Sequence, residues 1–455
     1  MCNLGNRMCT IWVTFRSTWR YSTIPCYGLS MDEATDSTKY VRREIDTLLD
    51  EVMPYFPAIA LEGAKGVGKT QTALQRAEHV LQLDSPGMSD LLAADPSIVH
   101  SRQGSVLIDE WQKYPPVWDI VRRAVDAGAP AGSFLLTGSA YPPHGAGIHS
   151  GAGRIDAVRM RPFAMQERSL ARTKVRIADI FHGMQSNVEA EEVAVGVTDY
   201  AEEICRSGFP GIMELPPRLR TMRLNSYVER LATHEFEELG QRIRDPQSVI
   251  RWLSAYAAGS SRTDSYQSIL DRATPGEADK PARKTTQGYR RLLEQLMILE
   301  PLPAWEPLQA GFPPLIRSPK HHLCDPGLAA TLLGATPASL ISGDPAQSEL
   351  FAQLFESFVL LSARVAAETF GAKTWHLRAR RGERELDILV EDMEKRILGI
   401  EVKVSPEVRD DDVAHLHWLR VQLGPKWAGG MVVHAGSHLY RRADGIWVVP
   451  LAALG

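Results

Sequence analysis

Long apolar runs are missing from this 455-residue sequence, since no stretch approaches the roughly eighteen apolar residues that a membrane span needs. Cysteine is also scarce. The five cysteines form no C-x-x-C pair and have no histidine at zinc-ligand spacing beside them. This excludes a disulfide-rich scaffold and a zinc-finger site. We therefore expect a protein of a reduced compartment, most simply cytoplasmic, without a membrane partner.

A strong excess of one charge is absent as well, because the formal net charge is only -4. The chain thus lacks the global basic signature of many nucleic-acid-binding proteins, and any contact with DNA or RNA must come from a local basic surface. Hydrophobic residues make up 44% and charged residues 23%, which is ordinary for globular protein. The length predicts two to four domains.

Acidic residues are missing altogether from residues 1–30, which contain three arginines and many Ser and Thr residues. Such a composition is typical of a transit peptide. The alternative is that translation starts at Met31, where ordinary sequence begins. We favour the alternative, in which residues 1–30 are a non-native or disordered N-terminal extension.

A phosphate-binding motif stands out in the part that follows. Residues 63–70 match G-x-x-x-x-G-K-[ST], the P-loop pattern, with an apolar strand-like run before them and a helix-forming run after them. Backbone N–H groups of such a loop cradle phosphates, the lysine bridges the β- and γ-phosphates, and the threonine hydroxyl binds magnesium. The motif predicts an ATP site with Mg²⁺. Its residues are Gly63, Ala64, Lys65, Gly66, Val67, Gly68, Lys69 and Thr70.

Two later strands carry the polar groups that hydrolysis needs. The run 106–110 is an apolar strand ending in Asp109, which we expect in the magnesium shell, and Glu110, which we expect to be the catalytic base for the attacking water. The alternative is a helix N-cap. The strand at 134–139 contains Thr137 and Ser139, which predict a polar sensor of the γ-phosphate lying between the other two strands. A plain turn would look the same.

A glycine-rich loop at 145–153 delivers Arg154. Such an arginine can neutralise transition-state charge on the nucleotide, either in cis or from a neighbouring subunit of a homo-oligomer. The alternative is a solvated loop arginine.

The middle of the chain reads as helical. Residues 166–233 predict a helical lid or linker, and residues 234–330 predict helices followed by a strand-like hairpin. Arg290 and Arg291 in the last of these helices would suit a DNA-binding winged helix, while a bare three-helix module is the alternative.

The last part, residues 331–455, holds a second set of candidate catalytic residues. A carboxylate, Glu356, lies in a largely apolar helical run, and Asp387 and Glu401 lie on two paired strands with Lys403 two positions further. We expect Asp387 and Glu401 to share a divalent ion and Lys403 to activate water, as in metal-dependent phosphodiester hydrolysis. The alternative is an Asp387–Lys403 cross-strand salt bridge without chemistry.

These residues together resemble a bacterial and archaeal family of predicted AAA-type ATPases whose C-terminal half is a domain of unknown function with a nuclease-like module. The resemblance covers roughly residues 40–450. It implies an α/β fold with an AAA-type P-loop NTPase core at 31–165, a helical lid, a winged-helix module and a PD-(D/E)-x-K nuclease-like α/β domain. Leu386 stands where the proline of that signature's name would be. The matching segments are Gly63–Thr70, Leu107–Glu110, Leu135–Ala140, Ser207–Pro210, Asp325–Leu328, Phe355–Glu356, Glu385–Asp387 and Glu401–Lys403.

Two functions follow from the sequence. The first is an ATP-hydrolysing enzyme that couples nucleotide state to a Mg²⁺-dependent nuclease-like domain acting on DNA or RNA. The alternative is a nucleotide-switched regulator that binds DNA or protein through a catalytically inactive nuclease fold.

Overall fold

The structure is a computed structural model that describes residues 40–101, 103–139, 151–183, 190–241, 243, 245–274, 283–307 and 311–455. Residues 43–455 form one compact unit. The N-terminal extension expected at 1–30 and the first part of the glycine-rich loop, 145–150, lie outside the described residues.

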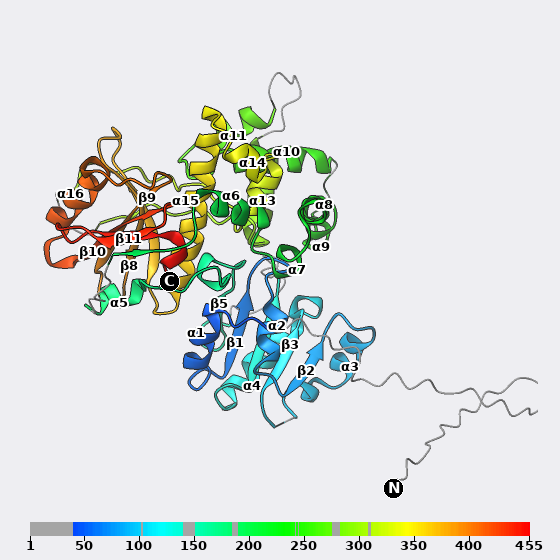
Figure 1. Cartoon of the computed structure of the whole chain (residues 1–455). Coiled ribbons are helices and arrows are strands. Elements are labelled where there is room, and N and C mark those ends of the chain that lie inside the picture. Colours follow the sequence, from blue (N-terminus) through cyan, green and yellow to red (C-terminus); the bar gives the residue numbers. More distant parts are fainter. Residues whose placement is uncertain are drawn as a thin grey trace, which may run out of the picture. The chain divides into compact units, whose positions relative to one another are not determined.

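The first sheet has five parallel strands in the order β2-β3-β4-β1-β5 (Figure 1). Three of them, β1, β3 and β4, are almost entirely buried apolar runs, as expected for a parallel sheet covered on both faces. Strand β4, which contains Thr137, lies between β1 and β3, as expected from the sequence. The strands are β1 Ala58–Glu62, β2 His79–Gln82, β3 Val106–Asp109, β4 Phe134–Gly138 and β5 Asp156–Arg159.

Alternate side chains of β1 enter two different hydrophobic cores, because successive residues of a strand point to opposite faces. Ile59 and Leu61 lie in one core, and Ala58 and Ala60 lie in the other. The described part of the chain is therefore α/β with a parallel sheet, as predicted for a P-loop core. The first helices are α1 Glu44–Val52, α2 Lys69–Leu74, α3 Met88–Ala94 and α4 Pro116–Asp126.

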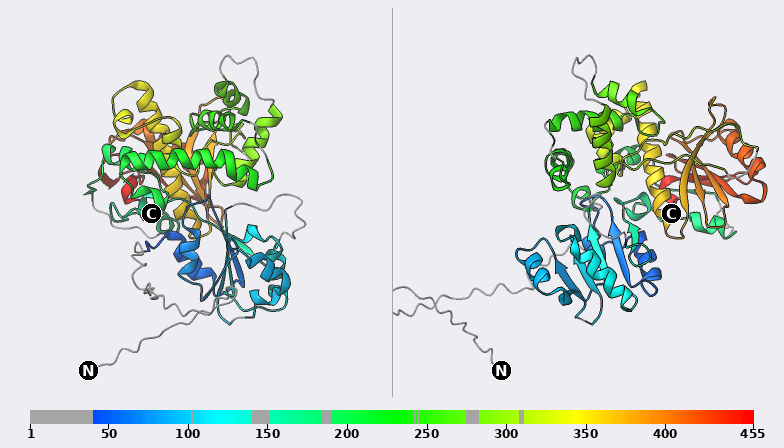
Figure 2. Two further views of the ribbon diagram at one scale, coloured as in Figure 1. Left: turned by 90° about the vertical axis from the view of Figure 1, so that its right-hand side faces the viewer. Right: turned by 180° about the vertical axis from the view of Figure 1, so that it is seen from behind.

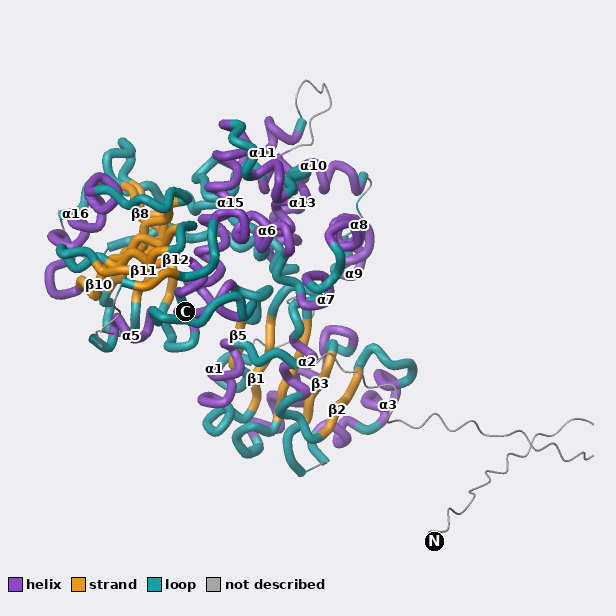
Figure 3. Tube along the Cα trace, in the orientation of Figure 1, coloured by secondary structure: helices purple, strands orange, loops and turns teal. Residues whose placement is uncertain are grey.

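The described part of the segment predicted as a helical lid is mostly helical, and Figure 3 shows its helices in purple. It contains one strand that we did not predict, β6 Glu191–Glu192, which pairs with β11 because it lies along the edge of the second sheet. The helices are α5 Ile177–Phe181, α6 Val197–Arg206, α7 Pro210–Met213, α8 Pro217–Arg230, the π-helix η4 Leu231–Glu235 and α9 Phe236–Glu238.

Three further helices precede two extended segments, in the order expected for residues 234–330. The extended segments form antiparallel bridges at Leu299–Leu323 and Leu302–Lys320. This order agrees with a winged helix and equally with a three-helix module carrying a short hairpin. The helices are α10 Pro246–Ala257, α11 Tyr266–Ala273 and α12 Arg283–Gln295, followed by α13 Pro326–Leu332 and α14 Pro337–Leu340.

The second sheet has seven strands in the order β6-β11-β12-β10-β9-β8-β7. Strands β8 and β9 are antiparallel neighbours, as predicted, whereas β9 and β10 are parallel. The remaining elements are α15 Pro345–Glu368, β7 Lys373–Arg378, β8 Glu385–Glu391, β9 Ile397–Lys403, α16 Ala414–Leu423, β10 Trp427–His434, β11 His438–Arg441 and β12 Trp447–Pro450. Short 3₁₀ helices lie at η1 Pro96–Val99, η2 Trp111–Lys113, η3 Met165–Glu167, η5 Asp410–Val413, η6 Gly424–Lys426 and η7 Leu451–Ala453.

Helix α15 packs against β7, β8 and β9 on one side and against α6 and α13 on the other (Figure 2). Contrary to the expectation from the sequence, it is, among the described residues, the one helix long and apolar enough to cross a membrane. However, 72% of its most apolar window is buried inside the structure. This burial is what the core helix of a soluble protein shows.

Candidate functional site

The P-loop follows β1 and packs closely against the backbone of Met160. Gly66 and Gly68 have φ angles of 87° and 104°, which L side chains rarely adopt. A Cβ at Gly63 would lie 2.2 Å from the Met160 carbonyl oxygen. Close packing therefore requires glycine at position 63, and the backbone conformation requires it at position 68. The conformation also favours glycine at position 66, although the motif allows any residue there.

The lysine of the motif is folded onto this loop. Lys69 Nζ donates to the carbonyl oxygens of Gly63 at 2.7 Å and Ala64 at 3.0 Å. Burial lowers the pKa of Lys69 to about 8, although the charge of Glu110 opposes this effect. An ammonium group held in this way would gain a stabilising partner from a phosphate placed in the loop.

Three predicted residues meet below the loop. Thr70 Oγ1 donates to Asp109 Oδ1 at 2.8 Å, and Thr137 Oγ1 donates to the same oxygen. Asp109 is buried. Hydroxyl and carboxylate oxygens are the ligands that Mg²⁺ prefers, so the donor set of Thr70 and Asp109 fits this ion.

The proposed base, Glu110, has a left-handed backbone with φ 54°, which is unusual for a residue other than glycine. Burial raises the pKa of its carboxyl group, although Lys69 opposes the shift. Its carboxylate accepts a hydrogen bond from Gln112 Nε2, which lies 3.5 Å from Ser139 Oγ. Gln112 thus links the base to the predicted sensor. Sequence reasoning missed Gln112, because no motif requires a glutamine two positions after the base.

The helical segment contacts the P-loop directly. Lys65 Nζ lies 2.7 Å from Glu235 Oε1, at the end of the π-helix, and the Tyr227 hydroxyl donates to the Lys65 carbonyl oxygen at 3.0 Å. A Cβ at Gly66 would lie 3.7 Å from the Phe209 ring. π-Helical turns often lie at functional sites. No sequence motif signals these contacts, because they join residues far apart in the chain.

Arg154 is placed away from the P-loop of its own chain. Its Nε lies 2.9 Å from Asp126 Oδ1, and it precedes β5, whereas the P-loop follows the carboxyl end of the parallel neighbour β1. Residues that precede β5 therefore lie at the amino ends of the strands, whereas the P-loop lies at their carboxyl ends. The structure does not bring Arg154 to the nucleotide site in cis, so a role as an arginine finger would have to be in trans.

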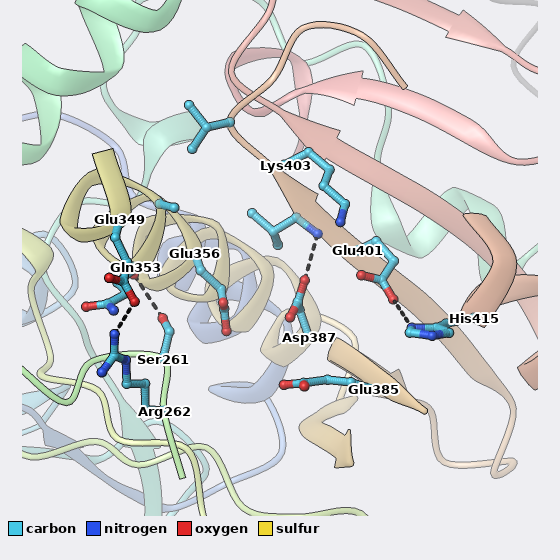
Figure 4. Close-up of a pocket in the computed structure, with 13 residues that line it drawn as sticks. Ser261, Arg262, Glu349, Gln353, Glu356, Glu385, Asp387, Glu401, Lys403 and His415 are labelled. Carbon is cyan, nitrogen blue, oxygen red and sulfur yellow. Dashed lines mark hydrogen bonds and ion pairs between the residues drawn. The ribbon is translucent and has the colours of Figure 1, made fainter. Parts of the chain in front are cut away.

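The second candidate site is a pocket of about 400 Å³ in the C-terminal part. Glu356 enters it from α15, Asp387 from β8, and Glu401 and Lys403 from β9 (Figure 4). All four predicted residues are thus brought together. In addition, Asp387 Oδ2 accepts a hydrogen bond from the Val402 backbone N–H at 3.0 Å, which fixes the carboxylate against β9.

A residue that sequence reasoning missed lies against these carboxylates. Lys320 Nζ is 2.9 Å from Glu356 Oε1, 3.0 Å from Asp387 Oδ1 and 3.4 Å from Glu385 Oε1. The structure pairs Asp387 with Lys320, and it pairs Lys403 with Asp412 at 3.4 Å. The cross-strand pair of Asp387 and Lys403 considered above is therefore not the arrangement seen.

Glu401 is buried and lacks a hydrogen-bond partner for its Oε1 atom, which lies 3.7 Å from His415 Nδ1. Burial raises the pKa of Glu401 to about 8, and the nearby charge of Asp387 acts in the same direction. Across the part of the chain that the structure describes, no group of three or more His, Cys, Asp or Glu residues is arranged to hold a metal ion. Because the ammonium of Lys320 lies between Glu356 and Asp387, these two carboxylates as arranged do not fit a shared divalent ion.

The two arginines predicted for DNA binding differ in their surroundings. Arg291 is exposed, whereas Arg290 is partly buried. The guanidinium of Arg290 lies 4.4 Å from the centre of the Tyr266 ring, and its Nε lies 3.1 Å from Glu294 Oε1. Arg291 is therefore the better placed of the two to meet a phosphate.

Models of known protein families match three parts of the chain. Residues 55–169 match the family model of an AAA domain. Residues 197–339 match a domain of unknown function (DUF8612), and residues 351–454 match another domain of unknown function (DUF4143). The first match confirms the AAA-type ATPase domain that the P-loop predicted.

Uncharacterized proteins of Mycobacterium bovis and Mycobacterium tuberculosis are each 23% identical over 422 residues, covering 90% of this chain and 83% of theirs. Among solved structures, the chain is similar to a Walker-type ATPase of Pyrococcus abyssi, with 15% identity, a TM-score of 0.38, and coverage of 64% of this chain and 96% of that one. The ORC2 protein of Aeropyrum pernix follows, with 11% identity, a TM-score of 0.25, and coverage of 65% and 87%. TM-scores this low carry no argument about function.

Proposed function

We propose that this chain binds and hydrolyses ATP with Mg²⁺, and that it couples its nucleotide state to a nuclease-like domain acting on nucleic acid. The observation that carries the ATPase part is the hydrogen-bonded group of Thr70, Asp109 and Thr137 below the P-loop. The AAA-domain match over residues 55–169 supports it.

The chain's own residues supply most of the chemistry. Backbone N–H groups of the loop hold the phosphate oxygens, and Lys69 neutralises charge on the β- and γ-phosphates. Thr70 and Asp109 would hold Mg²⁺, which supplies charge neutralisation at the phosphates when bound. Glu110 accepts the proton of the attacking water, and its raised pKa brings it closer to neutral pH, where a base works best. Thr137 and Ser139 are suited to sense the γ-phosphate.

Two contacts support the proposed coupling. Arg161, two residues beyond β5, pairs with Glu300 at 2.7 Å and with Glu368 at the end of α15. Ser207 Oγ donates to Asp325 Oδ2 at 2.6 Å, and the segment that follows Ser207 lies against the P-loop glycines. The first contact joins the segment after β5 to α15, and the second joins the segment beside the P-loop to α13, which packs against α15. Helix α15 carries Glu356, so a shift of this helix would move Glu356 within the second pocket.

For the second pocket we propose that Glu356, Asp387, Glu401 and Lys403 are the catalytic set of a nuclease-like domain, with Asp387 and Glu401 as candidate metal ligands. The winged-helix-like region would hold DNA or RNA. The second candidate function, a nucleotide-switched regulator with an inactive nuclease fold, is favoured by one observation. The ammonium of Lys320 lies between two of the carboxylates that catalysis would need.

The free thiols of Cys205 and Cys324 support the proposal of a reduced, cytoplasmic compartment. The experiment that tests the whole proposal is incubation of the protein with plasmid, linear and single-stranded DNA and with RNA. It is run with Mg²⁺ or Mn²⁺, with and without ATP, while phosphate release is followed. Phosphate release together with metal-dependent cleavage supports the enzyme. Saturable binding of nucleic acid without cleavage under either metal supports the regulator, and no phosphate release contradicts the ATP-hydrolysing enzyme.

A further inference from the structure

Lys320 is among the largest fully buried side chains of the protein, with 1% of its surface exposed. Burying an ammonium group is costly unless it is paired and hydrogen-bonded. Lys320 meets this requirement, because its ammonium group donates hydrogen bonds to Glu356 and Asp387 and forms an ion pair with Glu385 at 3.4 Å.

The backbone fixes this ammonium group in place. The N–H of Lys320 donates to the Leu302 carbonyl oxygen at 2.9 Å, and the N–H of Leu302 donates back to Lys320 at 2.8 Å. The neighbouring His321 forms a parallel bridge with Ser260. Lys320 is thus part of a paired extended segment, and its side chain reaches the carboxylates from an anchored position rather than from a loop.

The position of the ammonium is the one that a divalent cation would use. An ion shared by Glu356 and Asp387 must lie between their oxygens, and Lys320 Nζ lies 2.9 and 3.0 Å from the nearest oxygen of each. Magnesium–oxygen distances are about 2.0–2.1 Å, so an ion bound to both oxygens would lie in the space that the ammonium fills. The two cations therefore exclude each other.

We propose that Lys320 is the resident cation of this carboxylate cluster and withholds Glu356 and Asp387 from divalent metal. The inference rests on the proposed nuclease-like function only for the identity of the competing ion, Mg²⁺ or Mn²⁺. Metal-dependent cleavage that uses both Glu356 and Asp387 as ligands would require Lys320 to leave the cluster. A regulator without cleavage would keep Lys320 where it is.

The test is Mn²⁺ binding to the full chain without nucleotide, followed by electron paramagnetic resonance. Four proteins are compared: wild type, Lys320→Met, the double variant Lys320→Met/Asp387→Asn, and Arg378→Met. Arg378 is the matched control, because its Nε lies 3.4 Å from Glu385 and the change removes one positive charge near the cluster without touching Glu356 or Asp387.

We expect Lys320→Met to bind one Mn²⁺ roughly ten-fold or more tighter than wild type, because the two carboxylates lose their buried cation. The double variant should lose this ion, and Arg378→Met should resemble wild type. Equal Mn²⁺ affinity of wild type and Lys320→Met would overturn the proposal, and so would persistence in the double variant of the tighter Mn²⁺ binding gained in Lys320→Met.

Lys320→Met leaves partly buried carboxylates without their cation, so the variant can fail to fold. Wild type then decides the question together with Asp387→Asn. Tight Mn²⁺ binding by wild type that is lost in Asp387→Asn overturns the proposal, and its absence in wild type supports the proposal. None of these readouts depends on cleavage. A protein that cuts no nucleic acid contradicts the nuclease proposal and leaves the assignment of Lys320 standing.

Discussion

Thr70 Oγ1 lies 2.8 Å from Asp109 Oδ1, although 39 positions separate the two residues in the chain. The first belongs to the helix that follows the P-loop, and the second ends β3. Strands β1, β4 and β3 are parallel neighbours, so the two residues meet at the carboxyl ends of these strands. We propose that this pair holds the magnesium ion.

A change at this pair should remove the effect of magnesium on nucleotide binding. We expect Asp109→Asn to bind ATP with similar affinity in Mg²⁺ and in EDTA, because a neutral amide is a much weaker ligand for Mg²⁺. Wild type should bind more tightly with Mg²⁺. A fluorescent ATP analogue measures both affinities. Asp109→Asn that keeps the wild-type response to Mg²⁺ would show that the ion is held elsewhere.

The base assignment predicts a separation of binding from turnover. Glu110→Gln should bind ATP like wild type, while phosphate release falls by roughly 10²–10⁴-fold, because the amide cannot take the proton of the attacking water. Gln112→Ala is the matched variant, since it removes only the side chain that contacts Glu110; its loss should be smaller. Equal turnover by wild type and Glu110→Gln would refute the assignment.

The second pocket should be separable from the first. If the domain cleaves nucleic acid, Asp387→Ala abolishes cleavage and leaves phosphate release intact, because Asp387 contacts the second cluster and not the P-loop. Gel analysis of DNA and phosphate release are measured on the same preparation. Cleavage that survives in Asp387→Ala would assign it to a contaminant or to another site.

The partly buried Glu300 predicts a pH-dependent contribution to stability. Burial opposes its ionisation, but Arg161, Arg364 and Arg159 outweigh burial and lower the pKa of Glu300 to about 2. A carboxyl group with a depressed folded pKa stabilises the protein above its unfolded pKa of about 4.5, and this contribution is lost as the pH falls toward 2. At neutral pH it is on the order of 3 kcal/mol.

Glu300→Gln should therefore lower the free energy of unfolding at pH 7, and the difference from wild type should shrink between about pH 4.5 and pH 3. Urea unfolding at several pH values measures this difference. A gap that stays constant across this range would mean that Glu300 has an ordinary pKa in the folded protein.

The nucleotide site could be predicted from the sequence because its residues follow local patterns. The P-loop is a contiguous motif, and Asp109 and Thr137 each lie at or near the carboxyl end of a strand of one parallel sheet, where such ends must meet. Arg154 shows the limit of this reasoning. Local sequence does not tell at which end of the strands a loop lies. Arg154 precedes β5 and so lies at the amino ends of the strands, opposite the P-loop.

Lys320 could not be predicted, because it lies 67 positions before Asp387 and belongs to no motif. Its place follows from the pairing of residue 320 with residue 302, which only the folded chain reveals. The contact of Lys65 with Glu235 is of the same kind, since it joins the P-loop to a helix 170 positions away. Long-range pairing therefore supplies what periodicity and motifs leave out.

The central claim is that the loop at residues 63–70 binds the triphosphate of ATP. Isothermal titration calorimetry of the folded protein with ATP and Mg²⁺ tests it most directly, with Lys69→Ala as the comparison. We predict saturable heat with a stoichiometry near one for wild type, and affinity reduced roughly 100-fold or more in Lys69→Ala, which lacks the charged donor. No heat from the wild-type protein, or equal binding by both proteins, would contradict the claim.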